Sequence, residues 1–325
     1  MIAPISRGGF GKIILFGEHF VVHGLPALVG SIDNATQASI TITSHTESRI
    51  IDMRPKVPTY KPTKTDAYTL MLYNILSHLA ISRSVDVTLH GDLMVTSGGI
   101  GASAAASVAI VHALNTMFNL NLNKEQIYTT AFMGEKAIHG NPSGIDVAAS
   151  LWGGLMTFKK IDAHTCERKE IPSSTSLHLV IADSGKPANT KAVIAATNNL
   201  KETKPAFIAN LFDAYENVFA QAQKALEQNN LKKFGALMGE NQALLETLGV
   251  SDDSNNRMVA IALQAGALGA KITGSGNGGI IVALAENQQH AIAIQETFFA
   301  SGFYAMATSI RTLSQNQQIT QQKQI

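Results

Sequence analysis

The sequence predicts a mixed fold of strands and helices arranged in two domains, residues 1–174 and 175–325. The chain has 325 residues, of which 45% are apolar and 15% are charged, so it can form two hydrophobic cores or one large one. Strand patterns dominate its first part and helical patterns its last part. A polar stretch from Lys159 to Ser176 separates these two parts, and we place the domain boundary near its end.

The composition excludes several classes of protein. A formal net charge of +1 does not suggest a general nucleic-acid or membrane surface. Cys166 is the single cysteine, which rules out an intrachain disulfide and a cysteine-based zinc site. No apolar run reaches the length of a membrane span, and the first residues lack the apolar core of a signal peptide. We therefore expect a cytoplasmic protein, monomeric or homodimeric, with no nucleic-acid or membrane partner.

The first part of the chain has both strand and helix periodicities. Val85, Val87 and Leu89 alternate as in a half-buried strand, whereas Asn123 and Gly140 fit the N-cap and C-terminal cap of a helix between them. The expected strands are 11–16, 21–22, 27–32, 38–42, 47–53 pairing with 38–42, 85–91 and 155–158. The expected helices are 66–81, the helix that follows Gly101, 124–139 and 143–151.

Helical periodicity dominates the second part. The expected helices are 189–200, 204–227, 231–248, 254–267 and 288–301. The expected strands are 177–182, 270–273, 280–285 and 304–310. The glutamine-rich tail from Thr312 onwards predicts a loose end or a fraying helix.

A glycine-rich segment from Thr96 to Ser107 lies between a predicted strand and a predicted helix. Gly98, Gly99 and Gly101 carry no Cβ, so the backbone can curve closely around an anion. The first N–H groups of the following helix have no partner within the helix and favour negative charge. This pattern predicts a phosphate-binding loop; the alternative is an ordinary helix start with turn glycines.

Two other phosphate-binding motifs are absent or incomplete. The P-loop pattern does not occur, since Ile13 follows Gly11-Lys12 where a hydroxyl residue is needed. A dinucleotide fingerprint is matched only in a loose form, with Ala104 at its third glycine. The acidic residue that should follow it would be Glu125, which lies in a helical pattern.

Four short segments place unusual chemistry in one order along the chain. They are GKIILFGEHFVVHGLPAL from Gly11, GGIGASAAAS from Gly98, HGNPSGID from His139 with Glu135 upstream, and KITGSGNGG from Lys271. Together they resemble the signatures of the GHMP kinase superfamily, in the form found in its mevalonate kinases. Four matches in the right order are far more specific than any single one.

The sequence departs from the family signatures at a few positions. In the phosphate loop a usual proline is Thr96, a glycine is Ser97 and the first of two serines is Ala102. In the last signature Ser275 and Asn277 stand where small residues or glycine are usual. Many mevalonate kinases have an arginine at the position of Ala188.

The resemblance implies an α+β fold of the two-domain GHMP kinase type. Its N-terminal domain would be ribosomal-protein-S5-like and carry the phosphate loop, and its C-terminal domain would be ferredoxin-like. It also implies an enzyme that uses ATP and Mg²⁺ to phosphorylate the terminal hydroxyl of the small molecule mevalonate, early in isoprenoid synthesis.

The resemblance also implies a role for individual residues. Asp146 would be the catalytic aspartate, with Lys12 beside it. The spacing of Ser143 and Asp146 also fits a capping box, in which Asp146 only holds a helix start. Lys12 has the alternative of a solvent-exposed lysine at a strand end.

The metal, nucleotide and substrate roles follow in the same way. Ser103 and Glu135 would bind Mg²⁺, with a helix-start hydroxyl and a surface glutamate as the alternatives. Gly98, Gly99, Gly101, Ala102 and Ser103 would bind ATP. Gly274, Gly276 and Gly278 would shape the active-site floor or form only a hairpin turn. Glu18, His19 and Thr190 would face the substrate, and His23 and His139 are expected to be structural.

Two other functions remain open at this point. One is another small-molecule kinase of the superfamily, acting on phosphomevalonate or a sugar. A phosphorylated substrate would need further basic residues, for which Lys186 and Lys191 are the nearby candidates. The other is a non-catalytic homologue that binds a ligand. The retention of Lys12, Glu135 and Asp146 disfavours it, because buried charges are costly without a use.

Overall fold

The computed structural model describes residues 8–58, 65–96, 98–140, 142–161, 166–172, 176–188, 197 and 199–310. The chain forms two compact units built from alternating segments. The first unit comprises Met1–Lys12, Asp33–Val95 and Gly101–Gly153; the second comprises Ile13–Ile32, Thr96–Ile100 and Gly154–Ile325. Because each unit combines several separate segments, the units do not test the domain boundary expected after residue 174, and this boundary stays a prediction.

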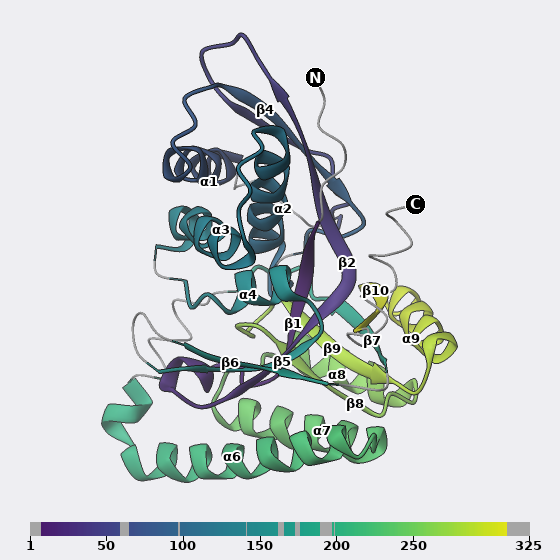
Figure 1. The fold of residues 1–325 in the computed structure, drawn as a ribbon. Helices are drawn as coiled ribbons and strands as arrows, with labels where there is room; N and C mark the ends of the chain where they lie inside the picture. The colour runs from purple at the N-terminus through teal and green to yellow at the C-terminus, as the bar shows by residue number, and fades with distance from the viewer. Residues whose placement is uncertain are drawn as a thin grey trace. The chain divides into compact units, whose positions relative to one another are not determined.

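The first unit combines a sheet with four helices. Strand β4 (Val85–Gly91) pairs antiparallel with the second half of β2 (Ala27–Ile42), from Thr36 opposite Gly91 to Ile42 opposite Val85, and parallel with β3 (Arg49–Asp52). The helices are α1 (Thr65–His78), α2 (Ala102–Met117), α3 (Lys124–His139) and α4 (Ile145–Trp152), and Figure 1 shows α1, α2 and α3 as neighbours.

Helix α2 lies in the core of this unit, because its residues are small or apolar almost all round. Ten of its residues are buried, from Ala104 to Leu114. Strand β1 (Gly9–Phe16) approaches it so closely that a Cβ on Gly9 would lie 2.2 Å from the Ala105 carbonyl oxygen. Helix α3 is equally close, because a Cβ on Gly134 would lie 2.4 Å from Ser107 Oγ. Because Gly9 and Gly134 have no Cβ, β1 and α3 can both pack closely against α2.

The second unit contains a four-stranded antiparallel sheet in the order β10-β7-β9-β8. Its strands are β7 (Leu177–Asp183), β8 (Gly269–Thr273), β9 (Ile280–Ala285) and β10 (Tyr304–Ile310). Its helices are α6 (Pro205–Glu227), α7 (Leu231–Thr247), α8 (Asp253–Gln264) and α9 (Gln288–Ala300). This strand order, with helices between β7 and β8 and between β9 and β10, is that of a ferredoxin-like fold.

A second set of strands belongs to the same unit. The first half of β2 pairs with β5 (Leu155–Lys160), and β5 pairs with β6 (Cys166–Ile171). A short 3-10 helix, η1 (Val21–His23), precedes β2. No helix in the described part of the chain is long and apolar enough to cross a membrane.

Most expected elements are confirmed, and three expectations are wrong. Residues 21–22 form η1 instead of a strand, and 27–42 form one strand instead of two. Strand β3 pairs with β4 and not with 38–42. Strand β6 lies in the polar stretch from Lys159 to Ser176, for which no strand was predicted, and it forms an edge of its sheet. The expected helix 189–200 lies mostly outside the described residues, and so does the glutamine-rich tail.

Candidate active site

An ion pair joins the two residues expected to be catalytic, and both lie in the first unit. Lys12 Nζ is 2.9 Å from Asp146 Oδ1. The lysine side chain is 5% exposed, whereas that of the aspartate is 35% exposed. Lys12 is therefore not the solvent-exposed lysine of the alternative interpretation. Its charge is held beside a carboxylate that remains open to solvent.

Asp146 does not form the capping box that its spacing allows. The N-cap of α4 is Gly144, in the left-handed region at φ 82°, and no side chain caps the helix. Ser143 Oγ instead accepts a hydrogen bond from Ile145 N at 3.4 Å. Asp146 lies in the first turn, where its charge suits the helix dipole, but its carboxylate faces Lys12.

A second polar cluster in the first unit connects α2 and α3. Ser103 Oγ donates to Glu135 Oε2 at 3.3 Å and lies 3.3 Å from His139 Nε2. His139 Nε2 is 3.6 Å from Glu135 Oε2, one turn along α3. The Glu135 side chain is 2% exposed, so it is not the surface glutamate of the alternative interpretation. The close approach of α2 and α3 brings these side chains together.

This cluster has the chemistry of a partial Mg²⁺ site. A carboxylate and a hydroxyl are hard oxygen donors, which Mg²⁺ prefers, and this ion usually keeps waters or phosphate oxygens as its other ligands. No group of three or more His, Cys, Asp and Glu side chains that could hold a metal occurs among the described residues. The donors therefore fit a metal shared with a phosphate-bearing ligand rather than a closed protein site.

The glycine-rich loop packs against the loop after β8, within the second unit. Gly98 and Gly99 have φ values of 153° and 87°, which favour glycine. A Cβ on Gly99 would lie 2.9 Å from the Thr273 carbonyl oxygen, and one on Gly274 would lie 3.0 Å from Gly99 Cα. The two loops therefore contact each other through bare backbone, which a simple hairpin turn would not require.

Gly276 and Gly278, the other two glycines expected to shape the active-site floor, lie close to neighbouring backbone. A Cβ on Gly276 would lie 2.0 Å from the Val250 carbonyl oxygen, and Gly278 has a φ of 102°. The fully buried Asn255 side chain exchanges two hydrogen bonds of 3.0 Å with the Gly278 backbone. Asn255 thus holds this loop in place, a role that its position in a helical pattern did not reveal.

A buried ion pair joins the first and last signatures in the second unit. Lys271 Nζ donates to Glu18 Oε1 and, at 2.7 Å, to the Ile272 carbonyl oxygen. Both side chains of the pair are fully buried. Burial lowers the pKa of Lys271, although the charge of Glu18 opposes this shift. No role was predicted for Lys271; the signal in the sequence is a lysine within an otherwise apolar strand.

His19 follows this pair in the same turn. It is 7% exposed, it has a left-handed φ of 62°, and its Nε2 lies 2.8 Å from the Ser275 carbonyl oxygen. Burial lowers its pKa to about 4, and the charge of Lys271 contributes to that shift. His19 is therefore neutral at pH 7. Since a carbonyl only accepts hydrogen bonds, Nε2 carries the proton and Nδ1 is the acceptor.

The remaining expected residues are Ala102 and Gly101 at the start of α2, and Thr190. Gly101 is the N-cap of α2 at φ 70°, and Ala102 is the first helical residue. Thr190 lies outside the described residues. His139, expected to be structural, lies beside Ser103 and Glu135. Its place four residues after Glu135 was the signal that could have identified it.

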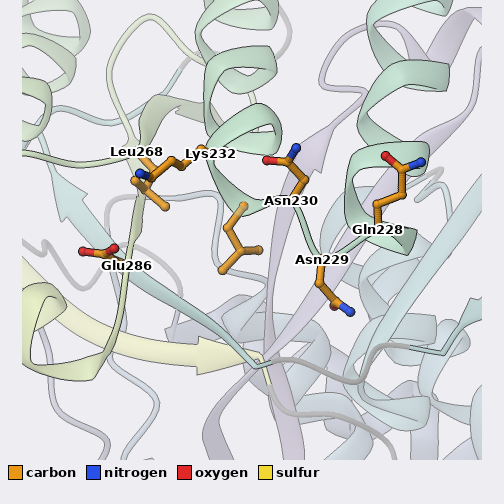
Figure 2. Close-up of a pocket in the computed structure, with 7 residues that line it drawn as sticks. Gln228, Asn229, Asn230, Lys232, Leu268 and Glu286 are labelled. Atoms are coloured by element: carbon orange, nitrogen blue, oxygen red, sulfur yellow. The ribbon is translucent and has the colours of Figure 1, made fainter.

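A separate hollow of about 470 Å³ lies beside the turn between α6 and α7 (Figure 2). Its lining is mainly polar and includes Asn229, Asn230, Lys232 and Glu286. No residue expected to be catalytic or to bind a ligand lines it. The hollow is thus distinct from the clusters described above.

The chain matches known proteins along most of its length. Residues 67–154 match the GHMP kinase N-terminal domain, and residues 222–304 match the GHMP kinase C-terminal domain. A mevalonate kinase of Pyrococcus furiosus is 31% identical, over 87% of this chain and 89% of the relative. A mevalonate kinase of Thermococcus gammatolerans is also 31% identical, over 92% and 94%.

Solved structures agree with these sequence matches. The crystal structure of L. major mevalonate kinase in complex with R-mevalonate has a TM-score of 0.91 and 33% identity, covering 95% of this chain and 96% of that chain. The match in fold and in sequence confirms the α+β fold of the GHMP kinase type. This chain belongs to the mevalonate kinase family of the GHMP kinases.

Proposed function

We propose that this chain transfers the γ-phosphoryl group of ATP to the terminal hydroxyl of (R)-mevalonate, giving 5-phosphomevalonate and ADP in isoprenoid biosynthesis. The observation that carries this proposal is the Lys12–Asp146 ion pair in a member of the mevalonate kinase family. The L. major structure, whose ligand is R-mevalonate, supports the choice of acceptor.

The roles of the two charged residues follow from what phosphoryl transfer needs. The reaction depends on positioning the attacking hydroxyl and on neutralising charge. Asp146 accepts or orients the proton of that hydroxyl. Lys12 offsets the negative charge that develops on the transferred group, and its burial strengthens this effect.

Ser103 and Glu135 would hold Mg²⁺ through a hydroxyl and a carboxylate oxygen, and the ion would supply positive charge that offsets the charge of the ATP phosphates. Gly98, Gly99, Gly101 and Ala102 supply close backbone, and the N-terminus of α2 supplies unpaired N–H groups for the phosphates. Gly274, Gly276 and Gly278 fix the neighbouring loop.

Glu18 and His19 are neighbours in the chain but have different roles on the substrate side. Glu18 is buried against Lys271 and fixes the turn, whereas His19 contacts the acceptor as a neutral imidazole. Thr190 is a further substrate contact in this proposal. Lys186, a candidate for binding a phosphorylated acceptor, is exposed and lies 3.7 Å from Asp252.

The test is ADP release with magnesium-ATP and each of three acceptors: mevalonate, phosphomevalonate and galactose. The phosphorylated product is identified by phosphorus NMR. The proposal expects turnover with mevalonate at a kcat/KM at least about a hundredfold above the other two, equivalent to about 3 kcal/mol. Preference for another acceptor would assign the chain to that activity, and no turnover with any of them would favour a non-catalytic homologue.

A further inference from the structure

A buried arginine lies under the start of α2. Arg54 is 2% exposed and follows β3. Its Nε and Nη2 donate to the two carboxylate oxygens of Asp52 at 2.9 and 2.7 Å, a bidentate pair. Burial lowers the pKa of the Arg54 guanidinium, but the hydrogen bonds that it donates to Asp52 and Tyr68 raise this pKa overall. The side chain is therefore a permanent buried cation.

The other bonds of Arg54 reach three further elements. Nη2 donates to Tyr68 Oη in α1 at 3.1 Å, and Nη1 donates to Thr36 Oγ1 in β2 at 3.1 Å. Nη1 also donates to the Ala102 carbonyl oxygen at 2.8 Å. A guanidinium has five N–H donors, and these five bonds use all of them. Arg54 has no donor left for a phosphate.

The bond to Ala102 acts on the phosphate loop itself. Ala102 is the first residue of α2, directly after Gly101. Its carbonyl group and the N–H of Ser103 belong to one planar peptide, and they point in opposite directions. Fixing the carbonyl therefore fixes the direction of the Ser103 N–H, one of the first N–H groups of the helix. It also fixes the backbone that carries the Ser103 hydroxyl.

We propose that Arg54 is a positioning residue for nucleotide binding, which aligns the Ala102–Ser103 peptide without touching the nucleotide. This inference rests on the proposed role of the glycine loop in binding ATP phosphates. A charged donor holds this peptide more firmly than a neutral one, since charge-assisted hydrogen bonds are about twice as strong. The Gly101 carbonyl oxygen accepts a hydrogen bond from Ala105 N at 3.0 Å, and the bond from Arg54 adds a second, charged restraint at the next carbonyl.

The same network also links β2, β3 and α1, so a purely stabilising role is the competing explanation. Comparing Arg54→Lys with two control variants separates these explanations. Tyr68→Phe and Thr36→Val each remove one bond to the guanidinium and keep the bond to Ala102. Arg54→Lys keeps a positive charge but cannot make the five bonds.

The experiment is calorimetric titration of each full-length variant with magnesium-ADP, together with the melting temperature and separate KM values for ATP and mevalonate. Arg54→Lys is expected to raise the Kd for magnesium-ADP and the KM for ATP about tenfold, equivalent to about 1.4 kcal/mol. The KM for mevalonate should stay within about twofold. Tyr68→Phe and Thr36→Val should lower the melting temperature while their Kd stays within about twofold of the wild type.

An unchanged Kd in folded Arg54→Lys overturns the inference, and so does an equal rise in Kd in Tyr68→Phe. If Arg54→Lys does not fold, Asp52→Asn serves instead, because it leaves Arg54 in place and weakens its anchor. The same rise in Kd is then expected, and its absence overturns the inference. The titration uses no acceptor, so a wild type that binds magnesium-ADP but phosphorylates no mevalonate disproves only the proposed function.

Discussion

Lys12 Nζ lies 2.9 Å from Asp146 Oδ1, although the two residues are 134 positions apart in the sequence. The lysine comes from β1 and the aspartate from the first turn of α4. Because the lysine is buried and the carboxylate is partly open, the pair presents a charge-balanced carboxylate to an incoming group.

Replacing Asp146 with asparagine should lower kcat for mevalonate phosphorylation by about 10² to 10⁴, the range for loss of a general acid or base. Asparagine keeps the shape of the side chain but cannot accept the hydroxyl proton. ADP release measures the effect. Ser143→Ala is the control, because Ser143 belongs to the same helix start and makes only a weak 3.4 Å bond. Near-normal turnover in Asp146→Asn would reject a catalytic role.

Replacing Glu135 with glutamine should weaken metal binding more than folding. The amide keeps the volume of the buried side chain but removes the charge that attracts the ion. In the presence of ADP, the apparent Kd for Mn²⁺, measured by electron paramagnetic resonance, should rise at least about tenfold, equivalent to about 1.4 kcal/mol. Glu125→Gln is the matched control, since Glu125 lies in the first turn of the same helix and is exposed. Equal Mn²⁺ affinity in both variants would contradict the metal role.

The Glu18–Lys271 pair should show strong coupling in stability. Removing one partner leaves a buried charge, so Glu18→Gln or Lys271→Met should each lower the free energy of unfolding by about 3–5 kcal/mol. The double variant should lose less than the sum of the two. Urea unfolding measures all three. Lys186→Met removes an exposed ion pair and should cost below about 1 kcal/mol. Additive losses would show that the pair does not act as a unit.

The stability of the protein should depend on pH through His19. Its pKa falls from 6.5 to about 4 on folding, so the unfolded chain binds more protons between these values. The contribution of His19 to the free energy of unfolding is fully present above pH 6.5. It is lost as the pH falls towards 4, and the loss is about 3 kcal/mol. His19→Gln should flatten this part of the profile of unfolding free energy against pH. A variant that keeps the wild-type slope would assign the dependence to other groups.

Helix packing at Gly134 should control the Ser103–Glu135 contact. An added Cβ would lie 2.4 Å from Ser107 Oγ, so Gly134→Ala should lower the free energy of unfolding by about 1–3 kcal/mol and raise the KM for magnesium-ATP. Gly239→Ala is the matched control, because Gly239 is an exposed helical glycine with nothing within 4 Å of an added Cβ. That control should gain about 0.5–1 kcal/mol. Thermal unfolding measures the stability of both variants, and steady-state kinetics measures their KM for magnesium-ATP. An unchanged KM in Gly134→Ala would show that this packing does not affect metal binding.

Local sequence determined much of the fold because local physics governs it. Helix α3 begins after Asn123, whose capping box with Gln126 is formed, and ends at Gly140. Strand β4 matches the alternation from Val85 to Gly91. Where partners decide the structure, the predictions were wrong. The parallel pairing of β3 with β4 and the continuity of β2 depend on neighbours that no local pattern specifies.

The candidate site divides in the same way. The sequence by itself determined the family, the glycine loops and the residue types suited to phosphoryl transfer, because these need particular chemistry in a particular order. Only the tertiary structure decided which side chains meet: Asp146 with Lys12 instead of a helix cap, Glu18 with Lys271, and Arg54 with the start of α2. Charges and hydrogen bonds act over a few ångströms in space, and distance along the chain does not report that proximity.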